Sequence, residues 1–217
     1  RERLRAFLKD TIRQEVDFSQ TDQNRGLAPP PVEKPCAEQA RRIDLPKADQ
    51  FKDLGKIDLF TAIARRESVR SYRPEPLSVK EVAFLLWATQ GVRRVLDPGH
   101  ALRTVPSAGC RHSFETYLCV LHVAGLEQGI YRYLPLEHQL VFEFAEHDLA
   151  PKVQQAVLGQ PYPARAALSF IWTAIPYRME WRYGPAAYKV IALDAGHVCQ
   201  NLYLACEAIG CGTCAIA

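Results

Sequence analysis

Arg66, Ser68 and Arg70 are spaced two residues apart, directly after a short stretch of helical character. If the chain leaves that helix at Arg66 and becomes extended, the three side chains point to one side. Guanidinium groups bind phosphate oxygens at two points each, so the spacing predicts a phosphate clamp. The alternative is a helix C-terminus whose arginines complement the helix dipole.

Two further segments are rich in small residues. Thr104–Gly109 (TVPSAG) is a turn with free backbone donors that could lie against a planar ring, although such segments are commonly plain loops. Gly210–Ala217 (GCGTCAIA) has thin side chains that let a backbone approach a flat ligand. Its alternative is a tightly packed inner strand, so each segment alone is a weak signal.

Metal and acid–base chemistry have little support. Cys211 and Cys214 have the C-x-x-C spacing of redox and zinc sites, but no second ligand pair stands at suitable spacing, so we expect no metal. His112 and His197 could act as acids or bases, yet a lone histidine is more often structural. No G-x-S-x-G, P-loop or G-x-G-x-x-G motif is present, which disfavours hydrolases and enzymes of nucleoside triphosphates. We predict no catalytic side chain.

The composition is that of an ordinary globular chain. Hydrophobic residues make up 48% and charged residues 24% of the 217 positions, which disfavours disorder. The net charge is +3 without a dense basic stripe, so we expect neither nucleic acid nor a membrane as partner. The longest apolar runs are too short to span a bilayer, and the N-terminus has no signal-peptide core. The 7 cysteines fit reduced thiols, which indicates a cytoplasmic protein.

The first part of the chain is predicted to be a helix followed by an arm. Residues 1–16 place apolar side chains on one side of a helix. Residues 17–53 show no sustained period and contain three consecutive prolines, Pro29 to Pro31, which indicates an irregular arm draped over a surface. We therefore separate an N-terminal helix and Pro-rich arm (1–56) from a folded domain (57–217).

The folded domain is predicted to begin with two helices. A short helix follows Asp58, with Leu59, Ile63 and Ala62 pointing inward. Ser78 and Glu81 form a capping box for a second helix, Val79–Thr89. Its apolar positions are Val82, Leu85 and Leu86, and Gly91 closes it.

A polar loop is then expected over residues 93–112, followed by strands. Strands are predicted at 116–124, 129–133, 139–144 and 166–175, of which the second and third form a hairpin and the last is buried on both faces. Short helices are expected after Asp148 and around Glu180–Tyr183.

The last part of the chain is predicted to be a long core helix capped by Asp194. Its buried face carries Val198, Leu202, Ala205 and Ile209, and Gly210 ends it in a left-handed conformation. A final strand follows. Because helices and strands are not strictly interleaved, the pattern favours an α+β fold with a mixed sheet.

Taken in order, the segments resemble the FMN-dependent nitroreductase family. The resemblance rests on four motifs and covers roughly residues 57–217: DLFTAIARRESVRSY (58–72), RTVPSAGCRHSFETYL (103–118), GIYRYLPLEHQL (129–140) and the segment 183–217. Within the family, the chain is most similar to the thiazole/oxazole-forming peptide dehydrogenases (SagB-type) and their stand-alone relatives. The resemblance implies a mixed, mainly antiparallel sheet flanked by helices. It also implies a homodimer with the long helix at its interface and two FMN sites there.

The resemblance also implies roles for individual residues. Arg66, Ser68 and Arg70 are expected to bind the FMN phosphate and ribityl chain, with Glu67 contributing backbone. In this family the isoalloxazine ring is often lined from the partner subunit, here by Pro106, Ser107, Ala108, Gly109 and Cys110. The reactive edge of the ring, where a backbone donor commonly faces N5, is expected beside Cys214, Ala215, Ile216 and Ala217. Flavin carries the electrons, so no acid–base pair is required.

Three functions follow from this resemblance. The first is an FMN-dependent oxidoreductase that passes hydride or electrons from NAD(P)H to a small nitro, quinone or other conjugated acceptor. The second is oxidation of an azoline in a modified peptide, and the third is a flavin-binding or degenerate partner subunit without turnover. Relatives continue beyond the GTCAI segment, so we expect the C-terminal end to be truncated at Ala217.

Overall fold

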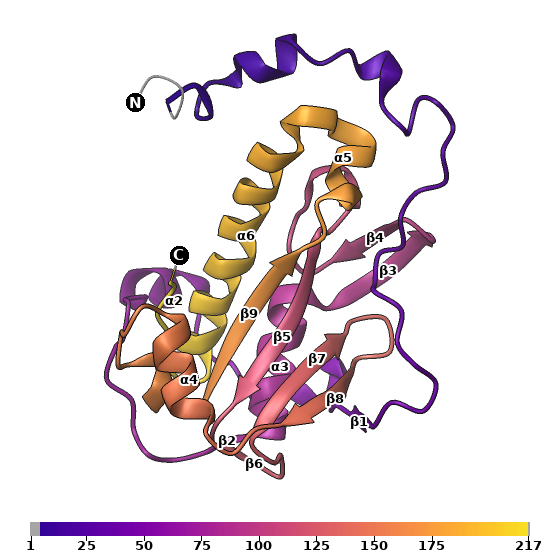
Figure 1. The fold of residues 1–217 in the computed structure, drawn as a ribbon. Coiled ribbons are helices and arrows are strands. Elements are labelled where there is room, and N and C mark those ends of the chain that lie inside the picture. The colour runs from indigo at the N-terminus through magenta and orange to yellow at the C-terminus, as the bar shows by residue number, and fades with distance from the viewer. Residues whose placement is uncertain (1–4, 217) are drawn as a thin grey trace.

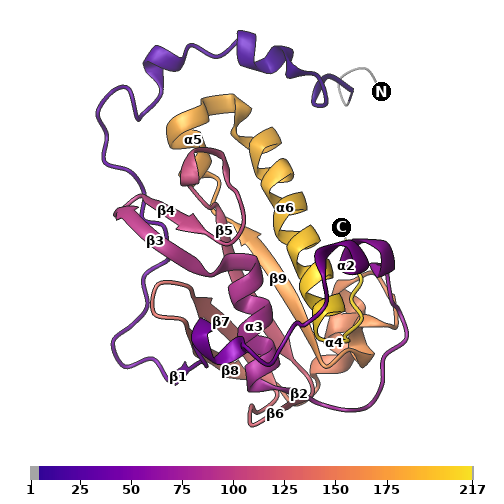
Figure 2. The same cartoon turned by 180° about the vertical axis from the view of Figure 1, so that it is seen from behind.

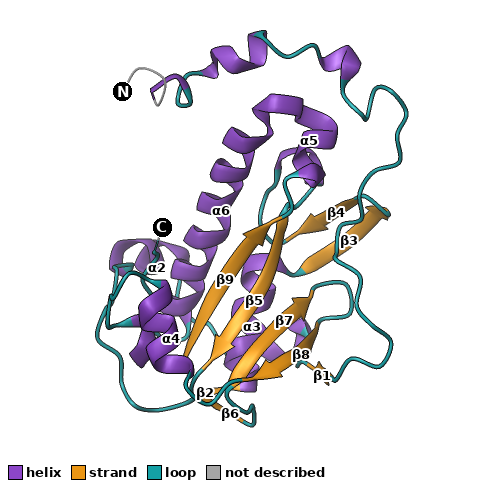
Figure 3. Ribbon diagram, in the orientation of Figure 1, coloured by secondary structure: helices purple, strands orange, loops and turns teal. Residues whose placement is uncertain are grey.

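The computed structural model describes residues 5–216. Its centre is a five-stranded sheet in the order β1-β8-β7-β5-β9, in which all neighbouring strands are antiparallel (Figures 1 and 3). The strands are β1 (Arg42–Asp44), β5 (Phe114–Val120), β7 (Gly129–Leu134), β8 (Gln139–Ala145) and β9 (Leu168–Ala174). Parallel pairing occurs between β2 (Leu77–Ser78) and β6 (Val123–Ala124). The predicted α+β class with a mainly antiparallel sheet is confirmed.

Two helices, α3 (Val79–Gln90) and α6 (Ala187–Ala208), pack on one face of the sheet (Figure 2). The predicted capping box starts α3, since Ser78 Oγ accepts from the Glu81 N–H and Glu81 accepts from the Ser78 N–H at 2.7 Å. Val82, Leu85 and Leu86 are buried against the sheet and α6, as predicted. The remaining α-helices are α2 (Leu59–Arg65), α4 (Leu149–Ala156) and α5 (Tyr177–Tyr183).

The long helix confirms the predicted buried face but not the predicted start. Val198, Leu202 and Ala205 are buried, and Gly210 ends the helix with a φ of 73°. However, α6 begins at Ala187, so Asp194 lies inside the helix and is not its cap. The physical reason is that Gly184 and Pro185 form a 3-10 turn (Gly184–Ala186) from which the helix continues directly.

Five other expectations about local structure were wrong. In the described part of residues 1–16, Arg5 and Ala6 are helical, but turns and the 3-10 segment Asp10–Gln14 follow in place of one continuous helix. Leu8 is 76% exposed, so no buried face stabilises a longer helix there. The expected polar loop 93–112 is largely occupied by a hairpin, β3 (Val92–Asp97) and β4 (His100–Arg103). The Asp97 side chain accepts from the Gly99 N–H at 2.8 Å and so forms the tight turn between these strands.

The strand β9, which lies at the edge of the sheet, is not buried on both faces. Phe170 and Trp172 pack against α6, whereas Ile171 on the opposite face is 43% exposed. At the C-terminus, residues 211–216 form an isolated bridge rather than a strand. The α2 side chains Leu59 and Ile63, expected to point inward, are 66% and 56% exposed, whereas Ala62 is buried.

The proline-rich arm runs along the outside of the molecule past β3, β4 and β8, as Figure 1 shows. Short 3-10 turns at Phe18–Gln20 and Ala48–Phe51 interrupt it, and β1 adds to the edge of the sheet. Val32, Leu45 and Phe51 are buried, so the arm contributes to the core. Within residues 5–216, none of the helices combines the length and the apolar character needed to cross a bilayer.

Candidate functional site

The segment after α2 carries the two predicted phosphate-binding arginines on two tyrosine rings. Asp58 caps α2 by accepting from the Thr61 N–H at 2.9 Å, and the chain leaves the helix at Arg66. The Arg66 guanidinium lies over the Tyr203 ring, 5.4 Å from its centroid. The Arg70 guanidinium lies over the Tyr162 ring at 5.8 Å.

Both guanidinium groups are available to an anion. Among residues 5–216, no carboxylate lies within ion-pair distance of Arg66 or Arg70. The single described hydrogen bond of either side chain is from Arg70 Nη1 to the Ser68 carbonyl at 3.4 Å. Glu67 is exposed. Two unpaired cations beside a hydroxyl are suited to a phosphate group.

The C-terminal segment lies directly beside this arginine segment. The Val69 N–H donates to the Thr213 carbonyl at 3.0 Å, and Ser68 pairs with Thr213 in a parallel bridge. A Cβ added at Gly212 would lie 2.6 Å from the Val69 Cβ, so only glycine permits this approach. In Figures 1 and 2 the last described residues lie beside α2 and the end of α6.

Individual residues of the C-terminal segment contact the two tyrosines that hold the arginines. The Ala215 N–H donates to the Tyr203 hydroxyl at 2.8 Å, and Cys214 Sγ lies 3.9 Å from the Tyr162 hydroxyl. Ile216 is 40% exposed, and Ala217 lies outside the described residues. The structure therefore brings together the first and third predicted segments.

The second predicted segment, Pro106–Cys110, lies elsewhere on the molecule. Pro106 is exposed, and Ala108–Cys110 form a 3-10 turn with positive φ angles of 61° at Gly109 and 57° at Cys110. Ser107 Oγ accepts from the His112 N–H at 2.9 Å, and the Ala108 N–H donates to Asp194 Oδ1 at 3.4 Å.

Asp194 contacts the Pro106–Cys110 segment, and Tyr203 contacts the arginine segment and the C-terminal segment. We call these two places on α6 the half-sites. At about 1.5 Å of rise per residue they lie roughly 14 Å apart along the helix axis. One chain thus brings two of the three predicted segments together and holds the third at the other half-site.

Three residues that contact the predicted segments were missed from the sequence. Tyr162 and Tyr203 carry no local pattern that separates them from ordinary core aromatics. Asp194 was interpreted as a helix cap, but it is a buried carboxylate whose pKa burial raises, and its Oδ2 has no described partner. A carboxylate in the middle of an apolar helix face was the available signal for a specific contact.

The surroundings of His112, His197 and Cys211 bear on acid–base and thiol chemistry. Burial lowers the pKa of His112 to about 3, so its ring is neutral, and Nε2 lies 2.8 Å from the Ala101 carbonyl. His197 is half exposed, 3.9 Å from Asp194. Burial raises the pKa of Cys211 to about 11, which disfavours a thiolate. The described residues contain no group of three or more His, Cys, Asp or Glu that could hold a metal ion.

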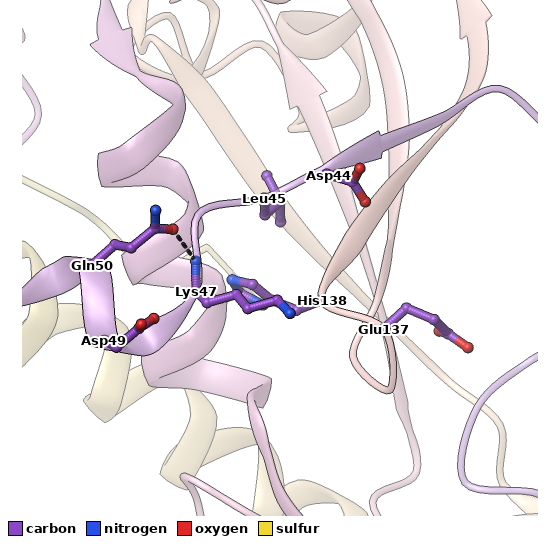
Figure 4. Close-up of a pocket in the computed structure, with 7 residues that line it drawn as sticks. All are labelled: Asp44, Leu45, Lys47, Asp49, Gln50, Glu137 and His138. Carbon is purple, nitrogen blue, oxygen red and sulfur yellow. Dashed lines mark hydrogen bonds between the residues drawn. The ribbon is translucent and has the colours of Figure 1, made fainter.

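An open hollow of about 450 Å³ lies elsewhere, between the 3-10 turn Ala48–Phe51 and the β7–β8 turn (Figure 4). His138 in its wall is already bonded on both ring nitrogens, to the Tyr133 hydroxyl at 2.7 Å and the Pro46 carbonyl at 2.9 Å. Gln50 accepts from the Lys47 N–H at 2.8 Å, as Figure 4 shows. No predicted site residue lines this hollow.

Comparison with known sequences gives one family over most of the chain. Residues 63–217 match the nitroreductase family. The protein MJ1384 of Methanocaldococcus jannaschii, named as a nitroreductase, is 32% identical over 167 residues, covering 77% of this chain and 82% of that protein. The trifolitoxin-processing protein TfxB of Rhizobium leguminosarum bv. trifolii is 32% identical over 145 residues, covering 63% of this chain. The chain spans only 39% of the length of TfxB.

Three solved structures share the fold. A protein of Ralstonia eutropha, named as a nitroreductase, is 30% identical with a TM-score of 0.61, covering 85% of this chain and 78% of that one. A protein of Anabaena variabilis, also named as a nitroreductase, is 23% identical with a TM-score of 0.62, covering 83% of this chain and 38% of that one. The Escherichia coli microcin synthetase complex McbBCD, with truncated pro-MccB17 bound, is 19% identical with a TM-score of 0.52, covering 87% of this chain and 76% of that one.

Proposed function

This chain belongs to the nitroreductase family, and on that premise we propose that it is an FMN-dependent oxidoreductase using NAD(P)H as electron donor. Its acceptor would be a nitro compound, a quinone or another conjugated molecule. The observation that carries the proposal is the juxtaposition of Arg66, Ser68 and Arg70 with residues 212–216. The nitroreductase family generally uses flavin, and this chain has a candidate phosphate site beside a segment of small residues that can approach a ring.

The residues present fit the phosphate of FMN. Arg66 and Arg70 have no carboxylate partner in the described chain, and the aromatic rings beneath them restrict their motion. Bidentate guanidinium contacts to phosphate are stronger than neutral hydrogen bonds, at about 1.5 to 3 kcal/mol each. The role of these side chains is to bind the phosphate and so fix the position of the cofactor.

The segment 212–216 fits the edge of the ring. Gly212 lets the backbone pack against Val69, and the following alanine and cysteine are small. When bound, FMN would supply the redox chemistry by accepting a hydride and passing electrons to the acceptor. The protein would bind the ring and leave one face open. The neutral, buried His112 is consistent with a site that needs no acid–base pair.

A second copy of the chain would complete the site. Six exposed residues form a stripe along α6: Tyr188, Ala192, Leu193, Gly196, His197 and Gln200. Tyr188 and Leu193 are 55% and 59% exposed, which is unusual for large side chains on a long central helix. If two copies pack through this stripe with their α6 helices antiparallel, the twofold axis lies midway between Asp194 and Tyr203. The Tyr203 end of each copy would then lie beside the Pro106–Cys110 loop of the other copy.

Exposed side chains of α2 extend this apolar surface. Leu59, Phe60 and Ile63 are 66%, 82% and 56% exposed. In Figures 1 and 2, α2 lies beside the C-terminal end of α6, so both helices can contribute to one interface. We therefore propose a homodimer in which each flavin site uses both copies.

The absorption spectrum of the purified protein tests this function. We expect flavin bands in stoichiometric amount that bleach on addition of NADPH or NADH and return with a nitro or quinone acceptor. The double variant Arg66→Ala/Arg70→Ala should release the flavin while its circular dichroism spectrum stays unchanged. Full FMN retention in that variant would refute the phosphate clamp.

The similarity to TfxB favours a second candidate, oxidation of an azoline in a modified peptide. TfxB is named as a processing protein for trifolitoxin, and McbBCD shares the fold. A yellow protein that ignores nicotinamides but oxidises an azoline-containing peptide would establish this second function. A colourless protein that cannot be reconstituted with FMN would instead indicate a partner subunit without turnover.

A further inference from the structure

The hydroxyl of Tyr203 joins three segments of the chain at one point. It lies 2.9 Å from Ser68 Oγ, in the arginine segment, and accepts from the Ala215 N–H at 2.8 Å, in the C-terminal segment. Tyr203 itself belongs to α6. Two segments separated by more than half the chain are thus bonded to a single oxygen atom.

The hydrogen-bonding capacity of a phenol accounts for both contacts. Its oxygen accepts the Ala215 N–H, and its one proton or that of Ser68 completes the second bond. The contacts stabilise relative position because α6 is anchored on both sides of Tyr203, where Leu202 and Ala205 are buried. Tyr203 therefore holds the arginine segment and the C-terminal segment in fixed positions relative to the helix.

The ring of Tyr203 has a role that its hydroxyl does not share. Its face supports the Arg66 guanidinium at 5.4 Å, a distance at which cation–π attraction operates. Removing the hydroxyl alone leaves this support in place. The backbone bond from Val69 to Thr213, at 3.0 Å, also remains, so the C-terminal segment keeps one anchor.

We propose that Tyr203 is the positioning residue that holds the phosphate-binding segment and the ring-edge segment in register. This inference rests on the proposed function, because the register matters for a ligand whose phosphate and ring are bound by different segments. While the Ala215 N–H donates to Tyr203 it is not free to donate to the ring, so Ala215 contributes position and not a direct contact.

The variant Tyr203→Phe tests the inference with two measurements. The first is hydrogen–deuterium exchange of the backbone amides of residues 211–216 in the protein without FMN. We expect faster exchange, because the Ala215 N–H loses its acceptor. The second is the Kd of FMN, which should rise about tenfold, because part of the binding free energy must then order the two segments that Tyr203 no longer holds.

Tyr177→Phe is the matched control. Its hydroxyl bonds Asp22 at 2.8 Å, far along the chain from both segments, so the same chemical change should leave exchange at 211–216 and the FMN Kd unchanged. Ser68→Ala in the Tyr203→Phe background should add less than its effect on the wild type, since the two residues share one bond.

Four outcomes separate this inference from the proposed function. Faster exchange at 211–216 together with weaker FMN binding supports it. Weaker FMN binding with unchanged exchange overturns the inference, because Tyr203 would then act by direct contact with FMN. An unchanged exchange rate together with an unchanged Kd also overturns it. If the wild-type protein binds no FMN, the proposed function fails while the exchange experiment still decides whether Tyr203 sets the register.

Discussion

Arg178 Nε donates a hydrogen bond of 2.8 Å to the carbonyl of Pro31, 147 positions earlier in the chain. Arg178 is 1% exposed, and its Nη2 lies 2.5 Å from Glu115 Oε1. A buried ion pair in the sheet layer thus holds the proline-rich arm. The arm is an integral part of the fold at this point.

Neighbouring arginines repeat the contact along the arm. Arg103 and Arg132, both 4% exposed, donate to the carbonyls of Val32 at 2.7 Å and Lys34 at 2.8 Å. Arg111, also buried, donates to Pro30 at 3.0 Å. This part of the arm is irregular, so its carbonyls have no partners in a regular strand pair, and the guanidinium groups satisfy them instead.

The first prediction concerns this ion pair. Arg178→Met should lower the free energy of unfolding by about 3 to 5 kcal/mol, because the Glu115 carboxylate and the Pro31 carbonyl lose buried partners. Urea titration followed by circular dichroism measures the change. The control Arg25→Met breaks an exposed pair with Asp22 at 3.7 Å and should cost no more than about 1 kcal/mol. Equal losses in the two variants would contradict a role for the buried pair.

The second prediction concerns pH and Glu33. Burial raises the pKa of this carboxyl from 4.5 to about 7, although it accepts from the Leu136 N–H at 3.0 Å. Between these values the folded protein retains a proton that the unfolded chain releases. The stabilisation from this proton is complete below about pH 4.5 and is lost as the pH rises through 7. Stability of the wild type relative to Glu33→Gln should therefore fall across this window.

Thermal or urea unfolding at several pH values checks the Glu33 prediction. Only the difference between wild type and variant is used, so the titration of other groups cancels. Glu38→Gln, which removes an exposed carboxyl from the same arm, is the control. A difference for Glu33→Gln that does not change with pH would show that its carboxyl is ionised across this window in the folded protein.

Local sequence signals predicted the elements whose causes are local. Ser78 and Glu81 lie three residues apart, and their reciprocal bonds form as expected. The buried face of α6 followed from helical spacing. In contrast, the partner of Asp194 is Ala108, 86 positions away, and no spacing rule could indicate that contact.

The exposure of the α2 side chains also could not be predicted from the local sequence. Leu59 and Ile63 have the spacing of a buried helix face, yet they are exposed in the single chain. The spacing indicates only that a face will be covered, and not whether the covering surface belongs to the same chain. The arginine and C-terminal segments were each predicted as candidates, but Tyr162 and Tyr203, which connect them, depend on the tertiary fold.

The third prediction concerns Gly212. Gly212→Ala would place a Cβ 2.6 Å from the Val69 Cβ, so the C-terminal segment must move away from the arginine segment. We expect a loss of about 1 to 3 kcal/mol in stability and weaker FMN binding. Thr213→Ala, which leaves the backbone path open, is the control. Calorimetry with FMN measures both variants, and tight binding by Gly212→Ala would show that this close approach is not required.

The final prediction concerns Leu193 and the proposed second copy. In a single chain Leu193 is 59% exposed, so Leu193→Glu should change stability by no more than about 0.5 kcal/mol. In a dimer that buries the α6 stripe, the same carboxylates would be desolvated near their symmetry mates, which opposes association. Light scattering should then give the mass of one chain, and FMN should be lost because each half-site lacks its complement. Leu96→Glu, at an exposed position on β3, should leave mass and FMN content unchanged. A dimeric, flavin-bound Leu193→Glu protein would place the interface away from this stripe and leave the Pro106–Cys110 loop without a role in the site.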